Sequence, residues 1–495
     1  MTATTATIGE DTTAATTTQP VKYEKGMQHR LVVRTNSTVA FVVTLEVNTL
    51  NNYGVAQTYL GLVVLVAAYV LIALEVVERG LVALVAMFLS LLLCTIGHKR
   101  FSLEDIAAWL DQPTFILLFG MMVIVKIFGE TGFFEWISVR AIKLSRGSVR
   151  LLFVLINLPT AIFSAFLDSV TTVLLSAPIT VKACEAMEIS PMPFLMAQAM
   201  LGNIAGAATM IGDPPNMIIG SLLREHVDFL SFIVNCGPMA LIGMFIATGY
   251  FLFWWRHTVA GTRKIELETM LKETEITQKR KLTLSSVVLA LVLFFFFLSS
   301  VLDVEPAWIA LAGAVALMLL TYPKHIDVPL SGVEWDMLVF FAALFVLINS
   351  MNSLGIIDLI SNIIAAAVRT VDPANHLYVA MTIVMWFSAI MSAFLSSIPT
   401  TTMLIPVIQQ MAANPTLNLP LRPLIWALSL GSCFGGNGTL IGAPSNLVVA
   451  GVVRSKGYFI TFTSFSKVSI PLTLILVALC NVYVIVVYGA LGWGH

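Results

Sequence analysis

Two short polar stretches interrupt long apolar runs of this 495-residue chain, and both contain groups that can bind an ion. They are DSVTT (168–172) and SSIPTT (396–401). Hydroxyl groups and exposed backbone amides at such breaks coordinate ions or oxyanions. The alternative is a kink whose hydroxyls bond back to their own helix. We interpret the two stretches as tips of re-entrant hairpins, near 164–187 and near 392–411.

A second pair of interruptions combines glycine, proline and asparagine. GDPPN (212–216) follows Gly202-Asn203, and GAPSN (442–446) follows GGNGT (435–439). Tandem prolines remove amide donors, and glycine lets the backbone unwind. An unwound helix frees carbonyl and Asn groups to bind cations, and the N-terminus of a half-helix can hold an anion. A purely structural kink is the alternative.

Two carboxylates lie within these interruptions, Asp168 and Asp213. An acid inside an apolar span is costly and is therefore a functional-site hypothesis. Paired carboxylates in a medium of low dielectric can exchange Na⁺ for H⁺, because desolvation favours the protonated form and a bound cation favours the ionised form. The alternative for one of them is a helix cap at a wet interface. Lys126, in the middle of the 113–131 run, is expected to pair with a carboxylate or to bind an anion.

The rest of the sequence must hold these groups inside a bilayer. Apolar residues make up 58% of the chain, charged residues 11%, and the mean hydropathy is +0.90. Soluble domains carry about 25% charged residues, whereas a spanning helix needs about 20 apolar ones. We expect an all-α polytopic membrane protein with about ten transmembrane helices, two re-entrant hairpins and two unwound helices. Its expected parts are a polar tail (1–57), a first half (58–255), a cytoplasmic linker (256–283) and a second half (284–495).

The two halves resemble each other, which indicates an internal repeat. The aligned segments are AIFSAFLDSVTT (161–172) with AIMSAFLSSIPT (389–400), ATMIGDPPNMII (208–219) with GTLIGAPSNLVV (438–449), and, more loosely, GFFEWIS (132–138) with GIIDLIS (355–361). If each half crosses the membrane an odd number of times, the second half is inverted. Inverted repeats with matching interruptions predict a substrate site at the midplane, between the halves.

Composition and motifs argue against several other classes. A net charge of −1 gives no basic field for nucleic acid, and no Walker-type phosphate loop occurs. The five cysteines are scattered singly, so we interpret them as packing residues. No histidine lies within an expected span, so we expect neither a serine–histidine enzyme nor a metal site. A receptor or assembly scaffold leaves the matched interruptions unexplained. We therefore expect a non-enzymatic transporter without a cofactor.

Lys and Arg in short loops predict the orientation. The count of crossings places the basic segments at 140–150, 256–283, Lys324 and Arg454 on one face, which we expect to be cytoplasmic. Both termini are then on the other face, where the sequon at Asn36 is open to glycosylation, although basic residues in the tail oppose its translocation. No signal-peptide pattern begins the sequence. The choice between plasma membrane and acidic organelle stays open.

Several segments resemble the family of the pigmentation P protein and its relatives in the ArsB/NhaD/citrate branch of the ion-transporter superfamily. The most specific are GDPPN and GGNGTLIG, and the likeness covers roughly 58–488. It implies a scaffold and a transport domain, usually a homodimer, and an elevator-type motion. It also implies that the hairpin tips and unwound helices hold the substrate. The residues so implied are Asp168, Ser169, Thr171, Thr172, Ser397 and Thr400 at the tips, and Asn203, Asp213, Asn216, Asn437, Thr439, Ser445 and Asn446 in the unwound helices.

The chain departs from that family at both tips. Members usually carry Asp-Asn there, whereas this sequence has Asp168-Ser169 and Ser396-Ser397. The lower charge weakens the case for simple cation/proton exchange and suits an anion or a neutral solute. We expect a secondary active transporter, for instance an antiporter, that moves a small ion or oxyanion by alternating access with Na⁺ or H⁺ as coupling ion. The alternatives are a chloride-like anion conductance and an arsenite or silicic-acid effluxer.

Overall fold

The computed structural model describes residues 52–74, 77–96, 100–262, 278–455 and 457–493. The expected tail with Asn36, and most of the expected linker, lie outside these residues. The helices of the first half are α1 (Asn52–Leu74), α2 (Arg79–Ile96), α3 (Leu103–Ala108), α4 (Gln112–Gly129), α5 (Phe133–Ser145), α6 (Val149–Leu167), α7 (Ser169–Ala186), α8 (Met192–Gly206), α9 (Pro214–Leu222), α10 (Phe229–Asn235) and α11 (Gly237–Trp254). Those of the second half are α13 (Lys279–Leu302), α14 (Pro306–Thr321), α15 (Asp327–Leu330), α16 (Trp335–Ser353), α17 (Ile356–Val368), η1 (Pro373–Asn375), α18 (His376–Leu395), α19 (Ser397–Ala413), α20 (Leu421–Gly435), α21 (Pro444–Ser455), α22 (Phe462–Val484) and η2 (Ile485–Ala490).

The outer surface of this helical assembly is apolar. Eight of the described helices are long and apolar enough to cross a bilayer, and three further apolar stretches are shorter. Large side chains such as Val63, Phe88 and Phe245 are 64%, 66% and 72% exposed. Exposed apolar area on this scale is unfavourable in water and is the normal state of a helix that faces lipid. The expectation of an all-α polytopic membrane protein is confirmed.

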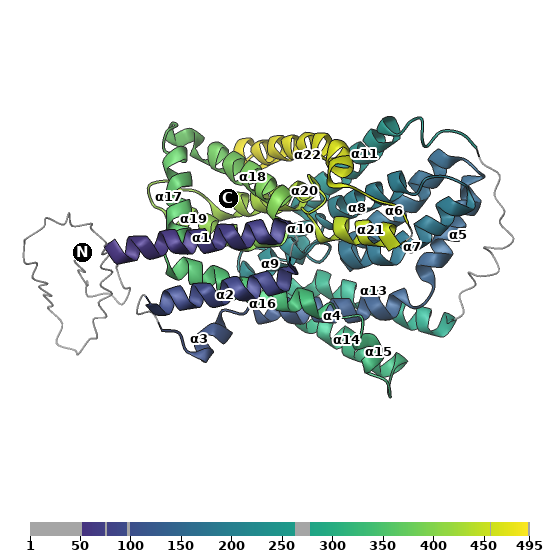
Figure 1. Ribbon diagram of the computed structural model, residues 1–495, viewed down its shortest axis with the longest axis horizontal. Coiled ribbons are helices and arrows are strands. Elements are labelled where there is room, and N and C mark those ends of the chain that lie inside the picture. The colour runs from purple at the N-terminus through teal and green to yellow at the C-terminus, as the bar shows by residue number, and fades with distance from the viewer. Residues whose placement is uncertain (1–51, 75–76, 97–99, 263–277, 456, 494–495) are drawn as a thin grey trace, which may run out of the picture.

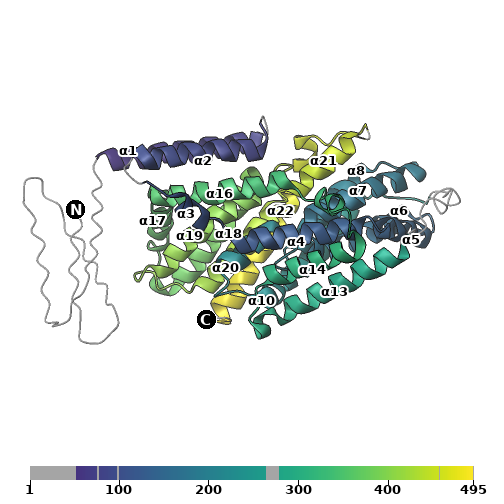
Figure 2. The same ribbon diagram turned by 90° about the horizontal axis from the view of Figure 1, so that it is seen from below.

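Each half contains one hairpin of two helices, and the two hairpins lie at opposite ends of the molecule. The first, α6 with α7, lies beside α5 at one end of the longest axis (Figure 1). The second, α18 with α19, lies beside α17 at the other end, and the perpendicular view agrees (Figure 2). The breaks fall at Asp168 and Ser396, as expected, but the first arms begin at Val149 and His376, well before the expected hairpin bounds. The two hairpins thus lie at opposite ends of the molecule, which is the arrangement that an inverted repeat requires.

The two halves interlock outside the hairpins as well. Helix α2 of the first half packs along α16 of the second, and α14 of the second packs along α4 of the first. In repeat order α2 corresponds to α14 and α4 to α16, so the two contacts are symmetric counterparts. Near the hairpins, α9 packs on α19 and α21 packs on α7 in the same reciprocal way. This pattern of contacts is that of a pseudo-two-fold axis.

Lys126 lies in the last turn of α4 and not in the middle of a span, contrary to the sequence expectation. Its ammonium is 3.4 Å from Oε1 of Glu130, and the ammonium of Lys281 is 3.2 Å from Oε2 of the same carboxylate. The Tyr322 hydroxyl also donates to Glu130. Of the two expected roles of Lys126, pairing with a carboxylate is therefore the one observed. The cluster connects α4 with α13 and α14.

The loops that interrupt the two unwound helices pass extremely close to other backbone. A Cβ added to Gly212 would lie 2.6 Å from the Gly206 carbonyl oxygen and 2.8 Å from that of Ala165. A Cβ on the counterpart Gly442 would lie 2.5 Å from the Gly436 carbonyl oxygen. Only glycine allows such an approach without a backbone shift. These positions hold each loop against the hairpin of its own half.

We therefore expect Gly212→Ala to lower the melting temperature of the purified protein in detergent. Overpacking against rigid backbone costs about 1–3 kcal/mol. The control is Gly249→Ala in α11, where an added Cβ meets nothing within 4 Å, and where alanine stabilises a helix by up to about 1 kcal/mol. Equal melting temperatures for the two variants would contradict the close approach at Gly212.

Candidate functional site

Both hairpins break at a single residue with left-handed backbone. Asp168 has φ 72° and ψ 135°, and Ser396 has φ 76° and ψ 148°. Such a sparsely populated combination of φ and ψ costs a non-glycine residue about 1–3 kcal/mol, so surrounding contacts must impose it. The next amide supplies one such contact, because Ser169 N–H donates to the Gly212 carbonyl and Ser397 N–H to that of Gly442, both at 3.2 Å. Strained residues of this kind concentrate at functional sites.

The interrupted helices lie against these tips and satisfy their own loops. Between α8 and α9, the Asn216 side-chain amide donates to the Thr209 carbonyl at 2.9 Å. Between α20 and α21, Asn446 donates in the same way to the Thr439 carbonyl at 3.0 Å. The hydroxyls of Thr209 and Thr439 in turn donate to hairpin carbonyls, those of Ala165 and Ala393. The predicted unwinding is present. However, the side chains of Asn216, Asn446 and Thr439 donate hydrogen bonds to carbonyl groups of their own half.

The two interrupted helices also bond to each other across the pseudo-two-fold axis. The Asn203 amide donates to Oδ1 of Asn437 at 2.9 Å and to Oδ1 of Asn446 at 3.2 Å. Ser445 Oγ donates to Oδ1 of Asn203 at 2.5 Å. The repeat counterparts of Asn203 and Asn446 are Cys433 and Asn216, and the Cys433 thiol points to Oδ1 of Asn216 at 3.3 Å. The same contact therefore occurs twice, with different chemistry in each copy.

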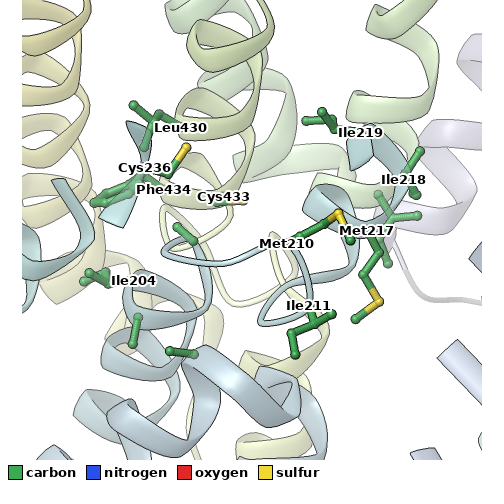
Figure 3. Packing of buried hydrophobic residues seen from close by; sticks show 14 of the residues in the cluster. Ile204, Met210, Ile211, Met217, Ile218, Ile219, Cys236, Leu430, Cys433 and Phe434 are labelled. Carbon is green, nitrogen blue, oxygen red and sulfur yellow. The ribbon is translucent and has the colours of Figure 1, made fainter. Parts of the chain in front are cut away.

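Apolar side chains enclose this polar crossing. Figure 3 shows Ile204 of α8, Met210 and Ile211 of the connecting loop, and Ile218 and Ile219 of α9 around the broken segment. All five are buried. Water is therefore kept away from the amide network, and the dielectric around it is low. Removal of one hydrogen-bond partner in such a place leaves the others unpaired at high cost.

The hairpin tips, by contrast, contain buried oxygens without a hydrogen-bond partner. These atoms are Asp168 Oδ1 and Thr172 Oγ1 in the first tip, and Ser396 Oγ, Ser397 Oγ and Thr401 Oγ1 in the second. A buried unpaired polar group costs about 1–3 kcal/mol, and in a native protein such groups call for an explanation such as a bound ion. Of the twelve such oxygens among the described residues, these five lie within six residues of a hairpin break, and the other seven are spread over other helices. The two tips are therefore candidates for ligand contact.

Other predicted tip residues are already engaged or covered. The Thr171 hydroxyl donates to Asp168 Oδ2 at 3.0 Å, and the Thr400 hydroxyl donates to the Ser396 carbonyl at 2.9 Å. Ser169 is buried at the start of α7. Sequence reasoning therefore selected Thr400, whereas the adjacent Thr401 presents the unpaired hydroxyl. The run of three threonines at 400–402 was the available signal, but only the helix geometry distinguishes them.

The two tips differ in charge. Asp168 caps α7 by accepting from the Thr171 amide at 3.0 Å, so a carboxylate occupies that helix N-terminus. Ser396 makes no side-chain bond to the first turn of α19. A helix N-terminus carries about half a positive charge, which is compensated in the first tip and uncompensated in the second. The first tip suits a cation and the second an anion.

Asp213 is the second predicted carboxylate, and it is only 4% exposed. It precedes α9 without capping that helix. It lies near Cys433 and close enough to Asp168 for the two negative charges to repel each other. The structure thus brings the two carboxylates into one region. Asp168 is a helix cap, as the alternative had it, yet it keeps one oxygen free.

A cavity of about 380 Å³ borders both tips. Val170 of the first tip, Ile398 of the second and Pro444 at the start of α21 form part of its wall. Three carboxylates that sequence reasoning did not select as site residues, Glu78, Glu334 and Asp336, also line it. Among the residues that the structure describes, no cluster of three His, Cys, Asp or Glu side chains is arranged to hold a metal ion.

The amide network gives a direct test. Asn203→Ala should lower the melting temperature strongly, because it leaves Asn437, Asn446 and Ser445 with fewer partners at about 1–3 kcal/mol per unpaired group. Ser445→Ala removes only one donor and should cost much less. Thermal denaturation of both variants in detergent measures the difference. A smaller loss for Asn203→Ala than for Ser445→Ala would show that Asn203 is not the centre of the network.

Comparison with known proteins identifies relatives over most of the chain. A family model described as "Citrate transporter" matches residues 69–431. The P protein of Sus scrofa is 34% identical over 88% of this chain, and that of Homo sapiens is 33% identical over the same share. The chain spans 60% and 61% of the length of these two relatives.

Bacterial relatives match along nearly their whole length. An uncharacterised transporter of Mycobacterium bovis is 34% identical over 86% of this chain and 98% of its own. The crystal structure of the YdaH transporter of Alcanivorax borkumensis superimposes with a TM-score of 0.53 over 90% of this chain and 99% of its own, at 15% identity, and so shows the shared fold alone. The family model and the bacterial relative together show that this chain, an integral multi-pass membrane protein, belongs to the citrate transporter family.

Proposed function

We propose that this protein is a secondary active transporter that couples the movement of a small anion or oxyanion to Na⁺ or H⁺ by alternating access. Membership of a transporter family establishes membrane transport as its role. The observation that carries the finer proposal is the difference between the two tips. One presents the Asp168 carboxylate, and the other an uncapped helix N-terminus with unpaired hydroxyls.

The two tips are chemically suited to binding both ions at once. Asp168, with Asp213 nearby, provides the negative charge that Na⁺ or H⁺ neutralises. Ser397 and Thr401, at the positive end of α19, provide donors for an anion. A cation bound at one tip removes repulsion against an anion at the other, so each ion favours the binding of its partner. Such mutual dependence is what coupling requires.

The packing of the helices supports alternating access. Helices α1, α2, α4, α13, α14 and α16 pack mainly on one another, while the hairpins pack on the interrupted helices α8, α9, α20 and α21. These two bodies correspond to the scaffold and transport domain of the family. The proposal includes movement of the second body against the first, and the homodimer that the family resemblance implies.

Asp213→Asn should abolish cation-coupled flux while leaving expression and the melting temperature nearly intact, because the amide keeps the size of the side chain but cannot be ionised. Uptake by proteoliposomes, driven by an imposed Na⁺ or H⁺ gradient, measures this. The control is Asp358→Asn on α17, an exposed carboxylate that accepts a hydrogen bond from Gln410 in the last turn of α19, at the end of that helix opposite to the tip. Unchanged gradient-driven uptake by Asp213→Asn would rule out its role in coupling.

Ser397→Ala combined with Thr401→Ala should raise the half-saturating concentration of the anion about a hundredfold or more, since each of the two charge-assisted hydrogen bonds contributes roughly 1.5–3 kcal/mol and about 1.4 kcal/mol is tenfold. The half-saturating concentration of the coupling cation should change little. A panel of chloride, phosphate, arsenite and dicarboxylates identifies the substrate. Currents that follow the electrochemical gradient without cation stoichiometry would instead favour the second candidate, an anion conductance, which the neutral second tip makes worth testing.

A further inference from the structure

The cavity beside the hairpin tips has two kinds of wall. On one side are Val170, Ile398 and Pro444, which belong to the tips and to the second interrupted helix. On the other side are residues of the scaffold body, at the start of α2 and at the start of α16. The cavity is therefore formed where the two bodies meet. A ligand that reaches the tips through this space must pass the scaffold wall.

The scaffold wall carries most of the cavity's charge. Glu78 and Asp336 are exposed, and Glu334 is partly buried. Arg79 is the basic side chain among the described lining residues.

Glu334 and Asp336 line the same cavity as Val170, which follows Asp168 by two residues. The negative charge of Glu334 is therefore repelled by those of Asp168 and Asp336. The net charge of this wall is negative, and it extends up to the first tip.

One oxygen of the Asp168 carboxylate has no hydrogen-bond partner and can therefore contact a cation. Oδ2 is used by Thr171, whereas Oδ1 is buried and has no hydrogen-bond partner. Glu334 offers no cap to α16, although it occupies the position that precedes that helix. The unpaired Oδ1 of Asp168 and the carboxylate of Glu334 thus belong to opposite walls of one cavity, which Glu334 lines from the scaffold and Val170, two residues after Asp168, lines from the tip. A shared cation or proton would relieve their repulsion.

We propose that Glu334 is a cation-selecting residue of the transport pathway, and that the cavity it lines with Glu78 and Asp336 is the chamber through which Na⁺ or H⁺ reaches Asp168. This rests on the proposed function and adds a scaffold residue to a site otherwise built from the moving body. A cleft with charges of one sign raises the local concentration of counter-ions by roughly 10- to 1,000-fold. If the hairpin moves away from the scaffold, Asp168 leaves Glu334, so cation affinity differs between the two states.

The first experiment separates cation from anion dependence in proteoliposomes. Glu334→Gln should raise the half-saturating concentration of the coupling cation about three- to tenfold, as expected from loss of a focusing charge, and should leave that of the anion unchanged. Glu334→Asp should restore most of the wild-type value. The matched control is Glu104→Gln on α3, an exposed carboxylate outside the cavity. Unchanged cation dependence in Glu334→Gln, with Asp168→Asn strongly impaired, would overturn the proposal and leave the transport function standing.

The second experiment measures the electrostatic potential of the cavity and does not depend on transport. All five native cysteines are buried, so Glu78→Cys provides an accessible thiol in the lining. Positively charged methanethiosulfonate should react with it faster than the negatively charged reagent of similar size, and adding Glu334→Gln should reduce that ratio severalfold. Adding Glu104→Gln should not. If the ratio of the two reaction rates is near one, or if Glu334→Gln does not alter it, the proposal that this cavity attracts cations is wrong, even if coupled transport is observed.

Discussion

The structure depends on one constraint, which is that backbone groups exposed by a broken helix inside a membrane must find partners within the protein. Four breaks occur here, two at hairpin tips and two in interrupted helices. Asn216 and Asn446 satisfy the carbonyls of their own loops, and the loop threonines bond the hairpins. The backbone groups at each break are thus hydrogen-bonded by residues of the same or a neighbouring break, so the four segments depend on one another.

This mutual closure explains why the two halves could diverge in chemistry without losing their shape. The backbone bonds at Ser169 and Ser397 are the same length in both halves, whereas the preceding residue is Asp168 in one and Ser396 in the other. Asn203, which contacts Asn446, likewise has a different residue as its repeat counterpart, namely Cys433, which contacts Asn216. The backbone contacts carry the symmetry, so side chains at the tips are free to differ in charge. A symmetric frame thus supports an asymmetric site.

Sequence reasoning located the breaks because glycine, proline and acid residues are expensive in apolar runs and so stand out there. The helical fold, the repeat and the position of both tips follow from that signal. The roles of individual polar residues do not follow from it. Thr400 and Thr401 are adjacent and identical in type, yet only the hydroxyl of Thr400 bonds a backbone carbonyl of the preceding helical turn. Glu334 was missed because it lies 166 residues along the chain from Asp168, and nothing local marks that proximity.

The exchange of partners between α2 and α16, and between α4 and α14, has a consequence for biosynthesis. When the first half leaves the ribosome, the helix faces that will bind α14 and α16 have no protein to cover them. They must be held by lipid, by the insertion machinery or by a chaperone until the second half is made. The packing of the first half is therefore completed only after α14 and α16 of the second half have been synthesised.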